Sequence, residues 1–184
     1  CLALHCFLAF LGGRQAGWCC VADLLTHGAA AVLVKASTRW EMASVFVVGT
    51  FMPDVASRVP SIGLGWVHVH LMQLPEFLLF AWEPMHQPFG MILMSYLLSM
   101  LFPVARRVVV FGNLLGGMTL HLLLDIIQSH HGAGYMLAFP FATGSFEFGW
   151  IGSEATVPFA IPMVLVSLWV IHKRKQALTV MQKR

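Results

Sequence analysis

The sequence predicts an all-α, polytopic membrane protein with about five apolar segments, an interfacial or re-entrant stretch, and an outer loop rich in glycine and aromatic residues. Hydrophobic residues make up 58% of the 184 residues and charged residues only 10%, whereas soluble domains have about 25% charged residues. The formal net charge is only +3, and the cations lie in short clusters between and after the apolar runs. Such clusters are typical of topology signals, so no nucleic-acid partner is expected.

Composition divides the chain into three regions. Residues 1–20 are expected to be an upstream extension or a flexible N-terminus, residues 21–172 a helical membrane domain, and residues 173–184 a basic cytoplasmic tail. All four cysteines lie in the first region, so a metal site in the membrane domain must use histidine and carboxylate ligands. We interpret Val21 as an alternative GTG start; a lipid-modified Cys1 is the other interpretation.

The first two apolar segments, residues 21–37 and 42–52, are short for a full crossing, which takes about 20 residues. We expect them to form a helical hairpin. The second helix is expected to end at Pro53 and Asp54, because proline disfavours the helical conformation of the residue before it.

The middle of the chain, residues 55–88, is apolar but is interrupted by glycines, prolines and Glu76. We expect helices that lie in the membrane interface or re-enter it, with Trp66 and Trp82 at the membrane surface. Three further apolar segments are predicted over residues 89–102, 107–128 and 156–171. The stretch between the last two is expected to be an ordered loop with a β-hairpin.

Positive charge predicts the orientation of these segments. If the five segments alternate in direction, three basic clusters fall on one side, which the positive-inside rule makes cytoplasmic. They are Lys35 with Arg39, Arg106 with Arg107, and Lys173 with Arg174 and Lys175. The opposite ends of the segments carry the polar residues with the most distinctive chemistry, so a site at the outer face of the membrane is expected.

The strongest functional signal is the pair His121 and Asp125, which lie inside residues 107–128. Residues i and i+4 share a helix face, and an ionisable residue within a membrane segment is a functional-site hypothesis by default. Three more candidate ligands lie in or beside other apolar segments: His27, Asp54 and His86. We expect these five residues to bind a divalent metal ion. The alternative is that such residues only hydrogen-bond one another to fasten helices.

Histidine and carboxylate ligands without thiolates suit zinc first, with manganese or iron(II) as alternatives. A metal site with an open position can activate water for hydrolysis. Arg58 is the candidate to bind an anionic group of the substrate, and Glu147 in the outer loop is the candidate general base. A single interfacial arginine such as Arg58 is more often a lipid-headgroup contact, and simple solvation explains Glu147 equally well.

The order of motifs gives a second line of argument. The chain contains DLLTHG, GTFMPDVASRVP, MHQPFG, GGMTLHLLLD, GYMLAFPF and GW in this order. Over residues 21–172 it resembles the bacterial and archaeal family of membrane-bound, metal-dependent hydrolases that includes the LexA-regulated inner-membrane members. The resemblance implies a prokaryotic inner-membrane location, and it implies the same ligand set: His27, Asp54, His86, His121 and Asp125.

Two departures from the family pattern bear on the chemistry. Many members have Pro-Asp-x-Asp-His where this chain has PDVAS after Met52, so a second acidic residue is missing and one metal ion is expected. His86 is followed by QPFG instead of a Thr-His-Ser element. The predicted function is hydrolysis of an amphiphilic or membrane-borne ester or phosphoester. The rivals are a non-catalytic membrane protein with the same polar cluster and, ranked last, a metal transporter.

Overall fold

The computed structural model describes residues 16–38, 40–129 and 134–182, and the helical fold class is confirmed over this part of the chain. Residues 1–15 of the predicted N-terminal extension lie outside it. The elements are, in order, α2 (Ala16–Ser37), α3 (Ala43–His70), α4 (Glu76–Phe80), the 3-10 helix η1 (Glu83–His86), α5 (Pro88–Ser99), α6 (Val104–Ile127), β1 (Gln128–Ser129), β2 (Ile151–Gly152) and α7 (Ser153–Gln182).

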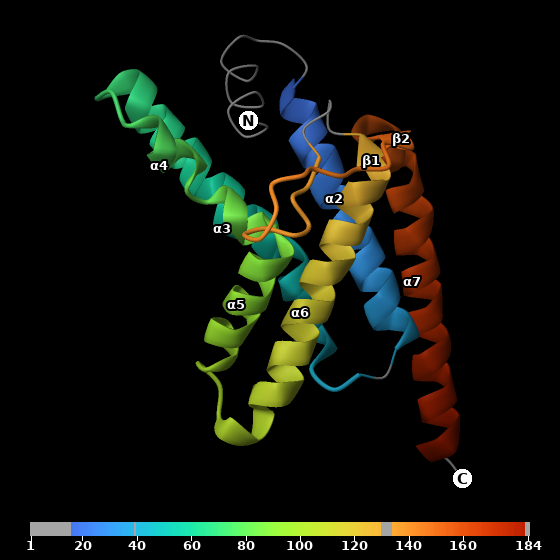
Figure 1. Cartoon of the computed structure of the whole chain (residues 1–184). Helices are drawn as coiled ribbons and strands as arrows, with labels where there is room; N and C mark the ends of the chain where they lie inside the picture. The colour runs from blue at the N-terminus through green and yellow to red at the C-terminus, as the bar shows by residue number, and fades with distance from the viewer. Residues whose placement is uncertain (1–15, 39, 130–133, 183–184) are drawn as a thin grey trace.

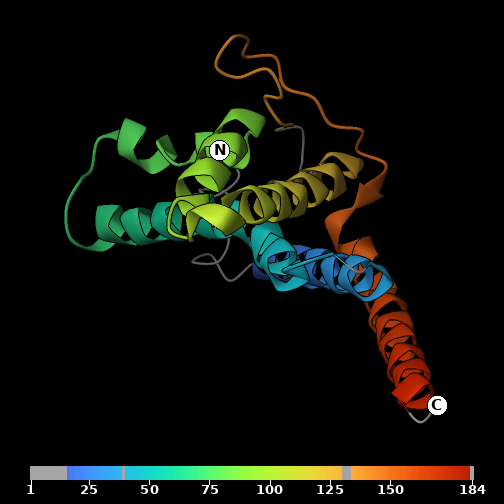
Figure 2. The same ribbon diagram turned by 90° about the horizontal axis from the view of Figure 1, so that it is seen from below.

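The helices pack in two groups that α2 joins. Helix α6 packs along α3 and α5, while α2 packs along α7 and against α3. In Figure 1 the turns α2–α3 and α5–α6 and the C-terminus lie at one end of the molecule, and the loop between α6 and α7 lies at the other. Seen from below in Figure 2, the C-terminal half of α7 diverges from the other helices.

The apolar core follows one stripe of α6. Its buried side chains recur every four residues, the spacing that keeps side chains on one helix face, and Met91 of α5 packs against them. The members of this core are Met91, Val110, Leu114, Met118, Leu122 and Ile126. The same stripe continues through His121 and Asp125, so the core and the candidate site share a helix face.

Two glycines let the backbones of α3 and α6 touch. A Cβ atom at Gly49 would lie 2.6 Å from the carbonyl oxygen of Leu114, and one at Gly117 would lie 2.7 Å from the backbone nitrogen of Thr50. A side chain at either position would therefore force the helices apart. Small residues at such crossings are typical of helix packing in membranes.

The prediction that a helix ends at Pro53 is wrong. Helix α3 runs without interruption from Ala43 to His70 and contains both Pro53 and Pro60. Proline removes one helical hydrogen bond and crowds the carbonyl four residues earlier. Tertiary packing offsets this cost, because Pro53 and Asp54 are both buried in the contact of α3 with its neighbours.

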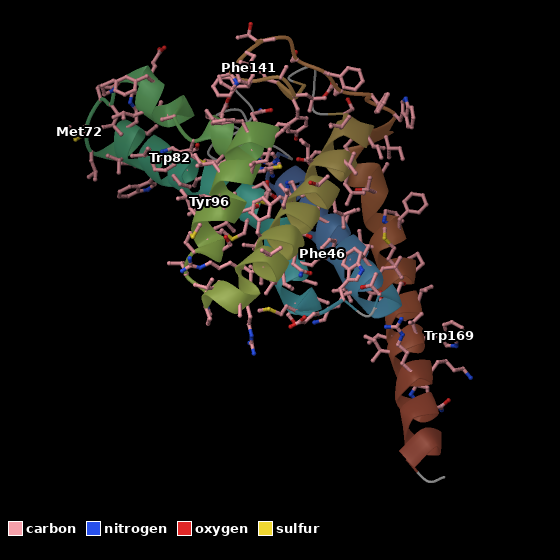
Figure 3. All side chains as sticks on the ribbon, turned by 60° about the horizontal axis from the view of Figure 1, so that its bottom comes forward. Phe46, Met72, Trp82, Tyr96, Phe141 and Trp169 are labelled. Atoms are coloured by element: carbon pink, nitrogen blue, oxygen red, sulfur yellow. The ribbon has the colours of Figure 1, made fainter. Side chains whose placement is uncertain are left out.

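The first half of the predicted interfacial stretch over residues 55–88 is helical and continues α3 as far as His70. The short helices α4 and η1 then return along α3. The end of α3 and α4 form an arm that projects from the other helices (Figure 1), with Met72 and Trp82 on it (Figure 3). This return brings His86 back to the middle of α3.

The loop between α6 and α7 contains a minimal hairpin contact. Tyr135 and Phe146 form an antiparallel bridge, in which each backbone N–H donates to the other residue's carbonyl, at 2.9 and 3.0 Å. β1 and β2 pair in parallel where the loop begins and ends. Helix α7 extends to Gln182, so residues 173–182 of the predicted tail are helical.

Among the described helices, only α6 is long and apolar enough to cross a bilayer, and 44% of its most apolar window is buried. Polar residues such as Thr50 and Ser95 are fully buried, whereas Val108 is 81% exposed and Ile161 64% exposed. Large apolar side chains are thus exposed while several polar ones are buried beside the apolar core. One helix that could span a membrane is thus present among the described helices.

The basic clusters lie at the end of the molecule with the short turns. Arg174 of α7 donates to the carbonyl oxygens of Ser37 and Thr38 at 2.8 Å each. Arg107 donates to the carbonyl of Phe102 at 3.0 Å in the α5–α6 turn, and this turn lies at the same end (Figure 1). Arg107 and Arg174 therefore lie at the same end of the molecule.

Candidate metal centre

All five predicted ligands lie together where four elements meet. His27 comes from the middle of α2, Asp54 from α3, His86 from the end of η1, and His121 and Asp125 from the last turns of α6. His27, His121 and Asp125 are completely buried, and Asp54 and His86 are nearly so. The cluster lies toward the loop end of α6 and away from the basic end.

Local structure explains why these side chains converge. The four-residue spacing of His121 and Asp125 puts both on the buried face of α6. The His27 ring stacks on the His121 ring with centroids 4.2 Å apart, which fixes α2 against α6. His86 ends η1 one residue before the N-cap Gln87 of α5, and Gly90 lets α5 touch the backbone of η1 at Pro84.

Three atoms form the centre of the cluster: Nε2 of His86, Nε2 of His121 and Oδ2 of Asp125. The two nitrogens are 3.0 Å apart, and the carboxylate oxygen lies 2.7 Å from the first and 3.3 Å from the second. Ligand atoms of a tetrahedral zinc ion at the usual bond lengths are about 3.3 Å apart. The three atoms are therefore as close as the ligand atoms of a zinc ion or slightly closer, at separations that hydrogen bonds also have.

The other two predicted ligands flank this triangle. Oδ1 of Asp54 lies 3.6 Å from Nε2 of His121, and Nε2 of His27 lies 2.9 Å from Oδ1 of Asp125. Two groups of three residues are close enough to hold a metal ion, His27 with His121 and Asp125, and Asp54 with His86 and His121. His121 belongs to both groups, so it is the central residue of the cluster.

The residues of the cluster fit a divalent cation. The carboxylates of Asp54 and Asp125 and the guanidinium of Arg58 have a summed charge of −1, and a buried charge without a counter-charge is costly. A bound cation would offset this charge. Nδ1 of His121 is buried with no hydrogen-bond partner in the described part of the chain, so that ring is oriented by packing and by its Nε2 contacts.

Arg58, the predicted anion-binding residue, lies one helical turn beyond Asp54. Its Nε is 2.8 Å from Oδ1 of Asp54, and the Arg58 side chain is 19% exposed. It is the more accessible partner of the two. Arg58 therefore holds Asp54 in place and carries positive charge beside the cluster.

Glu147, the predicted general base, is not a member of either ligand group among the described residues. It is partly buried in the outer loop, between Phe146 and Phe148. The backbone N–H of Phe148 donates to the carbonyl of Ile126 at 2.8 Å, which keeps this loop segment at the end of α6, next to Asp125. The backbone next to Glu147 is therefore held at the end of α6, and Glu147 belongs to neither ligand group.

Two residues of the site were missed by the sequence argument. Tyr135 donates its hydroxyl hydrogen bond to Oδ2 of Asp125 at 2.9 Å, and Oγ of Ser57 lies 3.2 Å from Nδ1 of His86. Ser57 could have been predicted, because it lies three residues after Asp54 and therefore on the same helix face. For Tyr135, the only indication in the sequence was its position in the GYMLAFPF motif.

Burial shifts the pKa values of Tyr135 in the outer loop and of His86 in η1. It raises the pKa of the Tyr135 phenol well above its usual value, and the neighbouring Asp125 carboxylate raises it further. Burial also lowers the pKa of His86, although its hydrogen bond with Asp125 acts in the opposite direction. Tyr135 is thus a protonated phenol that donates to Asp125.

Removing only the Tyr135 hydroxyl tests its role. We expect Tyr135→Phe to lower zinc affinity by about 10-fold, since partners that orient a metal ligand typically contribute 10- to 100-fold. The fold should persist, because the bridge to Phe146 uses backbone atoms. The measurement is competition for zinc with a chromophoric chelator. Tyr96→Phe, on the exposed face of α5, is the control and should bind zinc like the wild type; equal affinity of both variants would remove Tyr135 from the site.

Comparisons of this chain with protein-family models, with curated proteins and with solved structures found no match.

Proposed function

We propose that this protein is a multi-pass protein of a prokaryotic inner membrane that hydrolyses an amphiphilic ester or phosphoester with a divalent metal ion, zinc first. The observation that carries the proposal is the buried triangle formed by His86, His121 and Asp125, with separations of 2.7 to 3.3 Å. The motif order described above supports the same function. Such a dense set of nitrogen and carboxylate donors is suited to metal-assisted hydrolysis.

The residues of the chain have distinct roles in this proposal. A divalent ion held by the five ligands would supply a Lewis acid and an acidified water, whose pKa falls to about 7 in zinc sites. Arg58 attracts the anionic oxygen of the ester and offsets charge that develops on it. Glu147 is the candidate base in this proposal, and its carboxylate would accept the proton that the attacking water loses.

The surroundings of the cluster favour a substrate with an apolar part. The outer loop exposes large aromatic side chains: Phe141 is 90% and Trp150 69% exposed, and Phe141 projects from the loop in Figure 3. Phe148 and Trp150 also pack on each other, with ring centroids 4.6 Å apart. The proposed substrate is therefore a lipid or lipid-like ester, whose chain would lie beside these rings and whose polar head would be bound by Arg58.

The activity is tested on protein purified in detergent. We expect turnover of at least one member of a panel of lipid phosphoesters and carboxylic esters, and loss of that turnover with a chelator and in His86→Ala. Glu147→Gln should keep its metal but lose at least 100-fold in rate, the lower range for a general base. Metal-loaded wild-type protein that is inert toward the whole panel would contradict the catalytic proposal.

One observation favours a second candidate, a non-catalytic protein whose cluster fastens helices or binds a structural metal. His27, His121 and Asp125 are 0% exposed, as is usual for residues that tie helices together. The two functions differ in a measurable way. If the metal is structural, the protein should retain the metal and be stabilised by it against heat. It should then show no turnover of any ester in the substrate panel.

The orientation in the membrane is tested by cysteine labelling in whole cells. We expect Gly144→Cys, in the outer loop, to react with a membrane-impermeant maleimide, and Leu101→Cys, in the α5–α6 turn, to react only after lysis. Gly144 has open space around it and Leu101 is 79% exposed, so both positions tolerate the change. The four native cysteines are replaced by serine in both variants. The reverse pattern would place the cluster on the cytoplasmic side.

A further inference from the structure

Ser57 of α3 lies between two possible hydrogen-bond partners. Its Oγ is 2.7 Å from the carbonyl oxygen of Pro53 and 3.2 Å from Nδ1 of His86. Ser57 is itself 6% exposed and His86 7%, so water competes little for these contacts. The positions of the hydrogen atoms in this group decide whether the other ring nitrogen of His86, Nε2, carries a hydrogen or a lone pair.

A serine hydroxyl has one hydrogen to donate and can accept others. The Pro53 carbonyl can only accept, so the 2.7 Å contact requires the Ser57 hydrogen. Oγ of Ser57 then faces Nδ1 of His86 with a lone pair. A hydrogen bond at this contact therefore needs a hydrogen on Nδ1. Oδ1 of Asp54 is 3.8 Å from Nδ1. This distance is too long for a hydrogen bond, but the negative charge of the carboxylate favours a hydrogen on Nδ1.

This arrangement has a consequence at Nε2. A neutral imidazole has one N–H, so His86 with its hydrogen on Nδ1 presents a lone pair at Nε2. That lone pair faces Oδ2 of Asp125 at 2.7 Å, and a carboxylate oxygen is also an acceptor. Without a metal ion, a hydrogen on Nε2 makes this contact a hydrogen bond to Asp125. A metal ion held by His86 and Asp125 would take the place of that hydrogen, and the ring would then carry its one hydrogen on Nδ1.

We infer that Ser57 is a positioning residue that holds His86 as the Nδ1–H tautomer and so presents Nε2 to the metal. The inference rests on the proposed function, because it assumes that the cluster binds a metal ion. Metal-ligating histidines commonly donate the other ring N–H to a neighbouring acceptor, which fixes the tautomer and the ring orientation. No residue of the proposed ligand set takes this role for His86.

The first test is zinc affinity of the full chain in detergent, measured by competition with a chromophoric chelator after the protein is stripped of metal. We expect Ser57→Ala to bind Zn²⁺ 10- to 100-fold more weakly, the usual loss for such a partner. Ser57→Thr keeps a hydroxyl and should restore affinity to within about threefold of the wild type, since Thr bonds the same helix carbonyl.

Ser61→Ala is the matched control. Ser61 is also a buried serine of α3, 8% exposed, and donates to a helix carbonyl four residues back, that of Ser57, at 2.8 Å. Its loss should leave zinc affinity unchanged. Equal affinity of Ser57→Ala and Ser61→Ala would overturn the inference while leaving the metal site intact. A wild type that binds no Zn²⁺ would overturn both the inference and the proposed function.

A second measurement needs no serine variant. Nitrogen-15 NMR of histidine-labelled, zinc-loaded protein reports which ring nitrogen carries the hydrogen, and the His86 signals are assigned by their absence in His86→Gln. We expect His86 to show a protonated Nδ1 and a zinc-bound Nε2. A protonated Nε2, or a ring protonated on both nitrogens, would overturn the inference even if Ser57→Ala failed to fold.

Discussion

His121→Ala is expected to lower zinc affinity by more than about 100-fold, beyond the range typical of residues that only orient a ligand. His121 belongs to both groups that could hold a metal ion, and its Nε2 is within 3.6 Å of His86, Asp125 and Asp54. Removing it takes away the atom that links the two halves of the cluster. The measurement is metal content of detergent-purified protein, followed by zinc titration of the stripped protein.

Three further variants make this result specific. Asp125→Ala should lose metal as severely, since Asp125 contacts His27, His86 and His121. His172→Ala, an exposed histidine of α7, and Glu147→Gln should retain full metal content. Full occupancy in both His121→Ala and Asp125→Ala would show that the ligand assignment is wrong.

The sequence predicts the site better than it predicts the chain path around it. His121 and Asp125 stand out because polar residues inside an apolar helix need a partner, and four-residue spacing places them on one face. Local pattern alone does not place His86 beside them. That contact depends on the return of α4 and η1 along α3, which is a tertiary arrangement.

The error at Pro53 has the same origin. Rules for proline describe the cost to an isolated helix, about 3 kcal/mol, and say nothing of the packing that offsets it. In α3 the residue four positions before Pro53 is Gly49, which is in contact with the backbone of α6 at Leu114. A helix held this closely on one side can keep a proline.

Ser57 and Tyr135 were missed for a different reason. Both act on a ligand and do not bind the metal themselves in the proposed site, and a serine or tyrosine in an apolar chain has many ordinary uses. Only the contacts to His86 at 3.2 Å and to Asp125 at 2.9 Å distinguish them. A search of the helix face next to Asp54 would have found Ser57, whereas Tyr135 reaches the site from a loop.

The second large effect is expected from Gly117→Ala. Alanine is favoured over glycine within a helix by about 1 kcal/mol, so an isolated α6 would gain stability. In the protein, however, the new methyl group would meet backbone atoms of Phe46, Gly49 and Thr50 of α3. Backbone cannot move aside as a flexible side chain does, and overpacking of this kind costs about 1–3 kcal/mol or more. The clash exceeds the propensity gain, and the net effect is destabilising.

The separation of α3 from α6 also bears on the metal site, because α3 contributes Asp54 and α6 contributes His121 and Asp125. We expect Gly117→Ala to lower the unfolding temperature in detergent and to weaken zinc binding although it touches no ligand. Gly112→Ala is the control on the same helix, since a Cβ there meets nothing within 4 Å. It should leave zinc binding unchanged and the unfolding temperature equal or slightly higher. If both variants behave alike, the close approach of α3 and α6 at Gly117 does not hold the site together.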